Sequence, residues 1–381
     1  MQPSRKRLVA DLSQLVRIPS WQECDTIAAH VIRKLRAAGA RNVRRDAAGN
    51  VIATLGSGGP GLLLNAHLDT VPPADYAGDP FSGKVVRGRL LGRGSSDDKA
   101  GVAALLEIAR HLSRARLNQK VVIALTVWEE ATGPGPNGSY QVARDVRAAR
   151  GIVLESTMTP SGKTMAVNIG CKGNMKLYIR VKGKAYHASK PEKGVNAVYR
   201  AAEVVRRFQK AFDPATMPTK TYRVRGRAVT MRELATVTEI EATQGINIIP
   251  GECRISVNCR TLPDGDDAEI RRRMRKLAAA FPRGWLTWRT ERRILGHLST
   301  DDGLADACLE AIRETGLRSA CAIMTGRTDT AIFQREGGIQ SVVMGPGTIG
   351  TAHTNNEYVR IDSLVAGTRA VLLAVARLAC H

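Results

Sequence analysis

The sequence is poor in aromatic residues, acidic residues and long apolar runs. Aromatic residues make up 4% of the 381 positions and do not interleave with the basic clusters, so no stacking platform for single-stranded nucleic acid is predicted. No apolar run reaches the length of about 18 residues that a transmembrane helix needs, and the N-terminus carries no signal-peptide pattern. The seven cysteines include no CxxC pair, which indicates reduced thiols. We therefore predict a cytoplasmic protein without a membrane partner.

Acidic residues are outnumbered by basic ones, 35 against 57, which gives a formal charge of +22. Such a charge can indicate binding to nucleic acid or to an anionic surface. The basic residues are spread along the chain, however, and the densest runs, 206–210 and 271–276, fall in predicted helices. We interpret these runs as solvated helix faces and keep nucleic-acid binding as the minor alternative.

Strands alternate with helices in the first part of the chain, which is typical of an α/β sheet. The predicted strands are 43–55, 61–69, 121–128 and 151–155, with a hairpin over 84–94 that turns at Gly88 and helices over 4–17, 22–38 and 99–112. The same style returns after about residue 294. There we predict helices over 302–315, 328–335 and 361–378 and a strand over 341–344.

A different pattern separates these two parts. It begins near residue 172 as strand, helix, two strands, helix and strand, the order of a small α+β domain with a largely antiparallel sheet. The predicted elements are 175–181, 195–212, 237–241, 253–261, 266–280 and 286–293. We therefore predict an α/β domain, residues 1–172 and 294–381, with a central mixed sheet flanked by helices, into which residues 173–293 are inserted as an α+β domain.

The apolar run Leu62–Asp69, LLLNAHLD, ends in a histidine and an aspartate two residues apart. Glycines precede the run and Pro72 and Pro73 follow it, so we predict a buried strand. Residues i and i+2 of a strand point to the same face, so Asp69 can stand behind His67 and accept the proton of its far ring nitrogen. Metal-bound histidines are usually oriented in this way, although an ordinary polar pair at a strand end has the same pattern.

Other carboxylates follow predicted strands or turns. Asp97 and Asp98 lie in a glycine- and serine-rich turn before a helix, where a carboxylate also serves as an ordinary helix cap. The apolar strand 121–128 runs into Glu129 and Glu130, and buried paired carboxylates are costly unless something uses them. The remaining candidates are Glu155, at the end of a second strand, and His353, on a late loop.

Together these side chains are a ligand set of two imidazoles and several carboxylates, with no cysteine. Such a set suits zinc, with cobalt or manganese as substitutes. Three protein ligands usually suffice for one catalytic ion. The surplus predicts two divalent ions, about 3.5–4 Å apart, that share a bridging carboxylate.

Five segments carry a resemblance to a known family. They are HLDTVP, GRGSSDDKAG, WEEATG, GKAYHASKPEKGVNA and GPGTIGTAHTNNEY. In order and spacing they resemble the M20 metallopeptidases, which include acetylornithine deacetylases, succinyl-diaminopimelate desuccinylases, aminoacylases and glutamate carboxypeptidases. The resemblance covers nearly the whole chain. It implies that the larger domain is a di-metal catalytic domain and that the inserted domain is a lid and dimerisation domain.

The resemblance also implies roles for the residues of the larger domain. The implied metal ligands are His67 and Glu155 for one ion, Glu130 and His353 for the other, and Asp97 between them. Glu129 is the implied general base. Asp69, behind its histidine, completes the implied catalytic set.

Three residues of the inserted domain match family positions. His187, in KGKAYHAS, matches a histidine that reaches a neighbouring active site and stabilises the oxyanion. Asn247 and Arg260, in GINIIPGECRISVNCR, match positions that commonly bind the substrate carboxylate. The resemblance thus implies a homodimer in which His187 serves the partner's metals. Without the resemblance, His187 has the features of an ordinary surface-loop histidine.

The chain departs from the family pattern at three positions. Ser156 stands where the family usually has proline, Ala100 where it has glycine, and Asn258 where it has aspartate. None of these changes removes a ligand, so they bear on the subfamily and not on the chemistry.

The predicted activity is metal-dependent hydrolysis of a linear amide or peptide bond. The segment GPGTIGTAH is more similar to acetylornithine deacetylases than to desuccinylases, so we predict removal of an acyl group from an N-acyl amino acid. Within the family, the alternative is carboxypeptidase or dipeptidase action on a short peptide, or desuccinylation. Outside it, the alternative is a non-catalytic basic binding protein, against which the intact ligand set and Glu129 argue.

Overall fold

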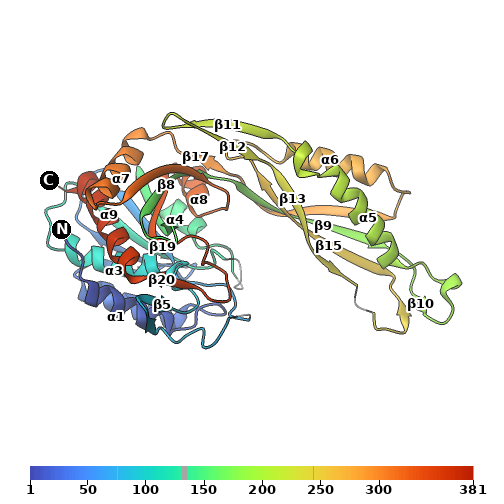
Figure 1. Cartoon of the computed structure of the whole chain (residues 1–381), viewed down its shortest axis with the longest axis horizontal. Coiled ribbons are helices and arrows are strands. Elements are labelled where there is room, and N and C mark those ends of the chain that lie inside the picture. Colours follow the sequence, from blue (N-terminus) through green and yellow to red (C-terminus); the bar gives the residue numbers. More distant parts are fainter. Residues whose placement is uncertain (75, 131–134, 243, 381) are drawn as a thin grey trace. The chain divides into compact units, whose positions relative to one another are not determined.

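The computed structural model describes residues 1–74, 76–130, 135–242 and 244–380. The chain divides into two compact units, each with its own hydrophobic core. Unit 1 comprises residues 1–170, 299–324 and 328–381, and unit 2 comprises residues 171–298 and 325–327. Figure 1 shows the chain with many of its helices and strands labelled.

The main sheet of unit 1 mixes parallel and antiparallel strands. Its strands are β1 (Arg41–Arg45), β2 (Val51–Leu55), β3 (Leu62–His67), β6 (Val121–Thr126), β7 (Arg150–Met158), β8 (Thr164–Cys171), β18 (Arg318–Met324) and β19 (Gln340–Thr348). They lie in the order β1-β2-β6-β3-β7-β19-β8, and β18 pairs with β8. β3 runs parallel to β6 and β7, and β7 runs parallel to β19. The pairs β1–β2, β2–β6 and β8–β19 are antiparallel.

Helices flank this sheet, so the predicted fold class is confirmed (Figure 1). They are α1 (Arg5–Val16), α2 (Asp25–Ala37), α3 (Lys99–Leu112), α4 (Ser139–Asp145), α7 (Asp302–Glu314), α8 (Thr330–Gly337) and α9 (Ile361–Ala379). α3 packs on β3, β7 and β19, and α1 covers α3 from another side. That double cover explains why α3 is apolar and buried almost all round. No helix in the described ranges is both long enough and apolar enough to span a membrane.

The hairpin predicted over 84–94 is confirmed as β4 (Val85–Val86) and β5 (Arg89–Leu91). Both central residues of its turn, Arg87 and Gly88, have positive φ, 48° and 75°. Such a turn matches the twist of the two strands it joins. β20 (Tyr358–Arg360) pairs with β5 and brings the late part of the chain to this hairpin.

Several predicted boundaries are wrong. The single strand predicted over 43–55 is two antiparallel strands, because the carboxylate of Asp46 accepts the amides of Ala48 and Asn50 and turns the chain. The strands predicted over 151–155 and 341–344 stop too early. They continue as β7 and β19 because the two strands stay paired as far as Met158 and Thr348. β8 and β18 were not predicted.

Unit 2 has the predicted order of strand, helix, two strands, helix and strand. These elements are β9 (Gly173–Lys182), α5 (Ala197–Ala211), β13 (Leu234–Glu241), β15 (Glu252–Thr261), α6 (Ala268–Ala279) and β16 (Leu286–Ile294). The strands form an antiparallel sheet in the order β13-β15-β9-β16. Alternate residues of β9 and β15 are buried against α5 and α6, which makes the unit's core.

Unit 2 also contains short strands that were not predicted. A hairpin of β11 (Thr219–Val224) and β12 (Arg227–Arg232) precedes β13, and its turn residues Arg225 and Gly226 both have positive φ. β10 (Tyr186–His187) pairs with β14 (Ile248–Ile249). β17 (His297–Leu298) follows β16.

Candidate metal centre

Parallel pairing brings the carboxyl ends of three strands to one edge of the sheet. His67, the last residue of β3, pairs with Thr126, the last residue of β6. Asn65 pairs with Val153 of β7, so Glu155, two residues further along that strand, lies level with His67. Ligands in open α/β sheets bind at this end of the strands. The structure thus places these predicted residues at the expected edge, although Glu155 lies within its strand and not at the strand's end.

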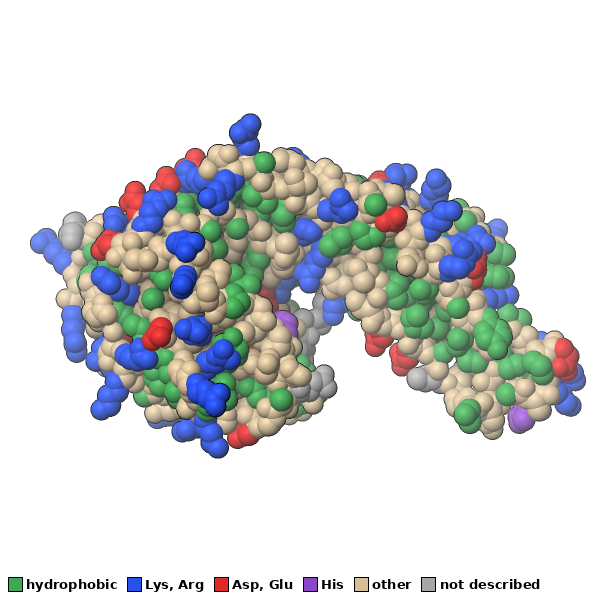
Figure 2. All heavy atoms as spheres, in the orientation of Figure 1, with side chains coloured by type: hydrophobic (Ala, Val, Ile, Leu, Met, Phe, Trp, Pro, Cys, Tyr) green, Lys and Arg blue, Asp and Glu red, His purple; other side chains and the backbone are tan. Residues whose placement is uncertain are grey.

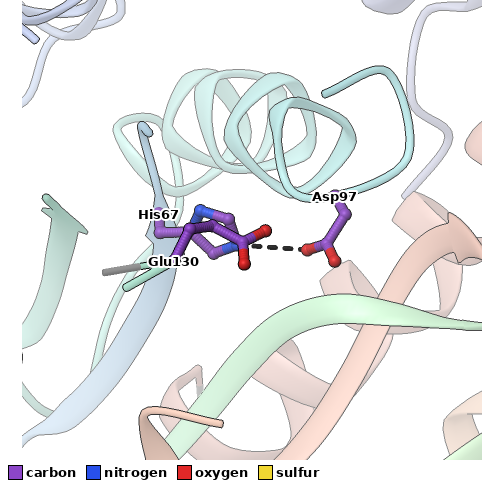
Figure 3. A group of neighbouring side chains, drawn as sticks. All are labelled: His67, Asp97 and Glu130. Atoms are coloured by element: carbon purple, nitrogen blue, oxygen red, sulfur yellow. Dashed lines mark hydrogen bonds and ion pairs between the residues drawn. The ribbon is translucent and has the colours of Figure 1, made fainter. Parts of the chain in front are cut away.

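His67 is the buried centre of the cluster, with 2% of its surface exposed. Its Nε2 lies 3.1 Å from Oδ1 of Asp97, and Figure 3 shows Glu130 beside this pair. Burial favours the neutral ring, but the hydrogen bond to Asp97 and the charges of Asp69 and Asp97 outweigh it. They hold the pKa of His67 well above its ordinary value.

Asp69 does not hold His67 in the predicted way. Nδ1 of His67 bonds the backbone carbonyl oxygen of Asp69 at 2.9 Å, while the carboxylate oxygen Oδ1 is 3.7 Å away. The carboxylate instead accepts the backbone amides of Glu129 and Glu130, at 3.1 and 3.0 Å. The chain bends just before these amides, where Trp128 has φ of 63°. Asp69 therefore sets the direction of the glutamate pair, and burial raises its pKa to about 6.

His353 comes to the cluster from the loop after β19. Its Nε2 lies 2.7 Å from Oε1 of Glu130 and 3.4 Å from Oδ2 of Asp97. Hydrogen bonds to these two carboxylates raise the pKa of His353 to about 10. The two oxygens of Asp97 thus face different histidines, Oδ1 towards His67 and Oδ2 towards His353. This is the placement that a bridging carboxylate needs.

Glu129 and Glu155 lie buried, each with 7% of its surface exposed. Burial, together with the charges of Glu129 and Asp97, raises the pKa of Glu155 well above its ordinary value. Oε1 of Glu155 is buried and has no hydrogen-bond partner among the described residues. Such an oxygen is costly in a protein interior unless a cation satisfies it.

These observations fit a divalent metal site. Ligand atoms of His67, Asp97 and Glu130 lie within 4.8 Å of one another (Figure 3). The donor set of imidazole nitrogen and carboxylate oxygen suits zinc, cobalt or manganese. The unsatisfied oxygen of Glu155 and the nearby ring of His353 extend the set beyond three ligands.

Glu357 was missed by the sequence analysis, although it holds the loop that carries Asp97. Its buried carboxylate accepts the backbone amides of Gly94, Ser96 and Asp97, each at 3.0 Å. It also pairs with Arg93 at 2.8 Å. Burial raises the pKa of Glu357. The available signal was its place in the segment HTNNEY, four residues after the predicted histidine.

Lys99, beside the aspartate pair in GRGSSDDKAG, made a site plausible, but the sequence predicted no role for it. Its side chain is fully buried, and Nζ donates to the backbone oxygen of Ile18 at 2.7 Å. Burial lowers the pKa of Lys99 to about 7. Lys99 therefore ties the turn that carries Asp97 to the segment after α1.

Two predicted residues of unit 2 meet in one short ladder. His187 lies on β10, and the next residue, Ala188, donates its amide to the backbone oxygen of Asn247 at 2.8 Å. His187 is exposed, and its Nδ1 lies 2.7 Å from Oγ of Ser189. Asn247 is exposed too. The structure thus brings together two residues that are 60 positions apart in the sequence.

Arg260 belongs to the other end of the same unit. Glu252 pairs with Lys182 at one end of the β9–β15 ladder, whereas Arg260 pairs with Asn174 at the other. Eight strand residues separate the two ends, which corresponds to about 27 Å. His187 and Asn247 lie beyond the first end. Within one copy of unit 2, these two residues and Arg260 cannot contact the same small substrate.

The sequence profile of one family, described as peptidase family M20/M25/M40, matches residues 63–377. The chain belongs to this family. The succinyl-diaminopimelate desuccinylase of Thioalkalivibrio sulfidiphilus is 28% identical to this M20 chain over 351 residues, 87% of each protein. That of Stenotrophomonas maltophilia is 28% identical over 369 residues, 91% of this chain and 92% of the relative.

Solved M20 structures share the fold. A tripeptidase of Staphylococcus aureus superposes with a TM-score of 0.75 at 23% identity, covering 99% of both chains. A metallo-carboxypeptidase of Sulfolobus solfataricus has a TM-score of 0.77 at 17% identity, covering 97% of this chain and 99% of its own. Family membership and the desuccinylase relatives identify this M20 chain as a metal-dependent hydrolase of amide or peptide bonds.

Proposed function

We propose that this M20 protein removes an acyl group from an N-acyl amino acid with the help of two divalent ions, zinc first among them. The supporting observation is the position of Asp97, whose two carboxylate oxygens face different histidines. His67 and Glu155 would hold one ion, and Glu130 and His353 the other. The buried Oε1 of Glu155, which lacks a hydrogen bond to any described residue, supports its place in this set.

Bound ions at this site would polarise the scissile carbonyl and make the attacking water more acidic. Glu129 takes the proton of that water as general base and then passes it to the leaving amine. Its position supports this role, because the side chain is buried beside Glu155 and its backbone is fixed by Asp69. His187 donates a hydrogen bond to the developing oxyanion. Arg260 and Asn247 bind the free carboxylate of the substrate.

A homodimer completes this proposal. His187 and Asn247 lie beyond one end of the β9–β15 ladder and Arg260 lies at the other. One substrate can therefore be served by all three only if two chains contribute. A twofold dimer is the commonest oligomer.

The acyl group is the part of the proposal with two candidates. The late segment GPGTIGTAH favours an acetyl group on an ornithine-like amino acid. The curated relatives are named as succinyl-diaminopimelate desuccinylases and favour a succinyl group. Peptidase action is the alternative to removal of an acyl group, because the structural relatives include peptidases. We place the protein in the cytoplasm, where reduced cysteines persist.

A substrate panel tests the proposal. The zinc-loaded protein is offered N-acetylornithine, N-succinyl-diaminopimelate and dipeptides, each with a free and an amidated carboxyl group, and release of the amine is measured. We expect one of the N-acyl amino acids to be hydrolysed faster than any dipeptide and its amidated form to be a poor substrate. Preference for a dipeptide, or indifference to amidation, would show that the proposal is wrong. Glu129→Gln is the control for contaminating hydrolases.

A further inference from the structure

A basic groove lies between α5 and α6 in unit 2 and has no role in the hydrolase chemistry. Its volume is about 570 Å³, and it joins the two densest basic runs of the sequence. The cations that line it are Arg206, Arg207 and Lys210 of α5 and Arg272, Arg273 and Lys276 of α6. In Figure 2, Lys and Arg side chains lie beside hydrophobic ones over the region where Figure 1 draws these two helices.

The two banks of the groove repeat one pattern, Glu-x-x-Arg-Arg-x-x-Lys, at residues 203–210 and 269–276. Positions three, four and seven residues apart share one face of a helix, so each bank presents a row of charges. Glu203 pairs with both of its arginines, at 2.8 and 2.6 Å, and Glu269 does the same, at 2.6 and 2.7 Å. Six cations and two carboxylates leave four positive charges along the groove.

Part of this charge is used within unit 2. Arg207 donates to the backbone oxygen of Ala280 at the end of α6, and Arg273 donates to that of Ala211 at the end of α5. These two arginines thus tie the helices together. Lys210 and Lys276 are exposed and form no ion pair with a described residue. The two lysines are therefore available to a ligand.

The lining of the groove also has an apolar part. Ala211, Leu277 and Ala280 line the groove together with the cations, Leu277 with 5% of its surface exposed. Nucleic acid would neutralise the rows but leave this apolar strip unused, and the lining contains no aromatic side chain on which a base could stack. The same groove of a second copy would be repelled by its like charge. An apolar stripe flanked by carboxylates, as on an acidic amphipathic helix, complements both features.

We propose that this groove binds an acidic amphipathic helix of a partner protein. The apolar stripe of that helix lies on Ala211, Leu277 and Ala280, and its carboxylates face Lys210 and Lys276. This inference is independent of the substrate proposed above, because the groove belongs to two helices that carry none of the predicted catalytic residues.

The probe is a fluorescein-labelled peptide as long as α5, 15 residues, with leucine at helical spacing and glutamate at most other positions. A second peptide has the same composition with the leucines dispersed, and a single-stranded DNA serves as a polyanion without an apolar stripe. Binding is measured by fluorescence anisotropy at about 0.15 M salt, where distant charges are screened. We expect the patterned peptide to bind at least about tenfold more tightly than the dispersed peptide or the DNA.

The variant that tests the site combines Lys210→Glu with Lys276→Glu. The matched control combines Lys84→Glu with Lys163→Glu, which makes the same change in charge at exposed lysines outside the groove. We expect the groove variant to bind the patterned peptide at least about tenfold more weakly and the control to bind it nearly as the unchanged protein does. Circular dichroism and thermal unfolding establish that both variants are folded. Equal loss in both variants, equal binding of all three probes, or no binding of the patterned peptide would overturn the proposal.

Discussion

The predicted catalytic residues of the two units are held in contrasting ways. In unit 1, His67, Asp69 and Glu129 are buried, and backbone amides near them donate hydrogen bonds to the carboxylates of Asp69 and Glu357. In unit 2, His187 and Asn247 are exposed on a short two-stranded ladder. Burial and hydrogen bonds to the surrounding backbone keep such side chains in place before anything binds. Exposed residues such as His187 have few contacts of their own and gain more only when a substrate or another chain binds.

The largest expected effect is a loss of turnover from a change in unit 1 that leaves metal content unchanged. Glu129→Gln should lower turnover by about 10²–10⁴-fold, because an amide cannot accept the proton of the attacking water. Metal content and substrate affinity should stay near normal. Steady-state kinetics and metal analysis of the dialysed protein measure both quantities.

Glu130→Gln is the matched control, because Glu130 is the neighbouring residue and contacts His353 at 2.7 Å. It should lower metal content, in contrast to Glu129→Gln. If Glu129→Gln kept near-normal turnover, or if both variants lost metal equally, the roles of the pair would be assigned wrongly.

The second prediction concerns unit 2. His187→Ala should lower turnover by about 10²–10³-fold, the usual cost of losing one oxyanion donor, with metal content unchanged. Mixing this variant with Glu129→Ala under conditions of subunit exchange should restore roughly a quarter of the activity. The reason is that half of the dimers are mixed and each mixed dimer has one intact site.

The control for this experiment is each inactive variant mixed with itself. Demonstrated exchange without recovered activity would mean that His187 acts within its own chain. Unit 2 would then not need a second chain to bring His187 to the substrate.

The third prediction tests whether the loop of Asp97 depends on its buried support. Glu357→Gln replaces one carboxylate oxygen by an amide group that cannot accept a backbone N–H. We expect metal affinity to fall by about 10–100-fold, as when other residues that orient metal ligands are changed. Isothermal titration with zinc measures this. Glu314→Gln, which removes only an exposed pair with Arg377, is the control and should leave the affinity unchanged. An equal affinity in both variants would contradict the positioning role.

The smallest expected effect is on stability: a carboxylate in each unit makes the free energy of unfolding depend on pH, with opposite signs. Burial raises the pKa of Glu233 in unit 2 to about 7, so the folded state holds its proton more tightly than the unfolded chain does. Its contribution to stability is therefore present below about pH 4.5 and is lost as the pH rises to 7. In unit 1, Glu107 is paired with Arg7 and Arg110, which hold its pKa at about 2 against the effect of burial. Its contribution has the opposite sign and is lost as the pH falls from about 4.5 to 2.

Thermal unfolding between pH 4.5 and 7.5 measures the contribution of Glu233. Glu233→Gln should remove a pH-dependent loss on the order of 1 kcal/mol in the free energy of unfolding. Glu239→Gln, an exposed change in the same unit, is the control. An unchanged pH dependence in Glu233→Gln would mean that this carboxylate does not titrate in that range.

Much of the metal centre could be predicted because its residues follow apolar strands in parallel register. Strand ends and loops gave His67, Glu130 and His353 as candidates, and the resemblance of their segments to the M20 family implied their roles. The predicted contact between the Asp69 carboxylate and the His67 ring was wrong. The rule that residues i and i+2 share a face holds within a strand, and β3 ends at His67. The turn at Trp128 brings the amides of the glutamate pair to the Asp69 carboxylate instead.

The burial of Glu357 and its contacts could not be predicted from the sequence. A glutamate in the polar segment HTNNEY has the pattern of an exposed loop residue, yet it is buried because its partners are amides about 260 positions earlier. The hairpin of β11 and β12 was missed for a related reason. Its strands are mostly polar, so neither periodicity nor burial distinguishes them from a loop.

The dependence of Asp97 on Glu357 has a consequence for how the protein is made. A ribosome releases the segment with Asp97 long before the segment 353–357 that supplies both His353 and the support for Asp97. A growing chain therefore contains His67 and Asp97 before it contains His353 or the carboxylate of Glu357 that holds the loop of Asp97. The cluster can be assembled only after residues 353–357 have been made, so chains that stop before them should neither retain metal nor hydrolyse substrate.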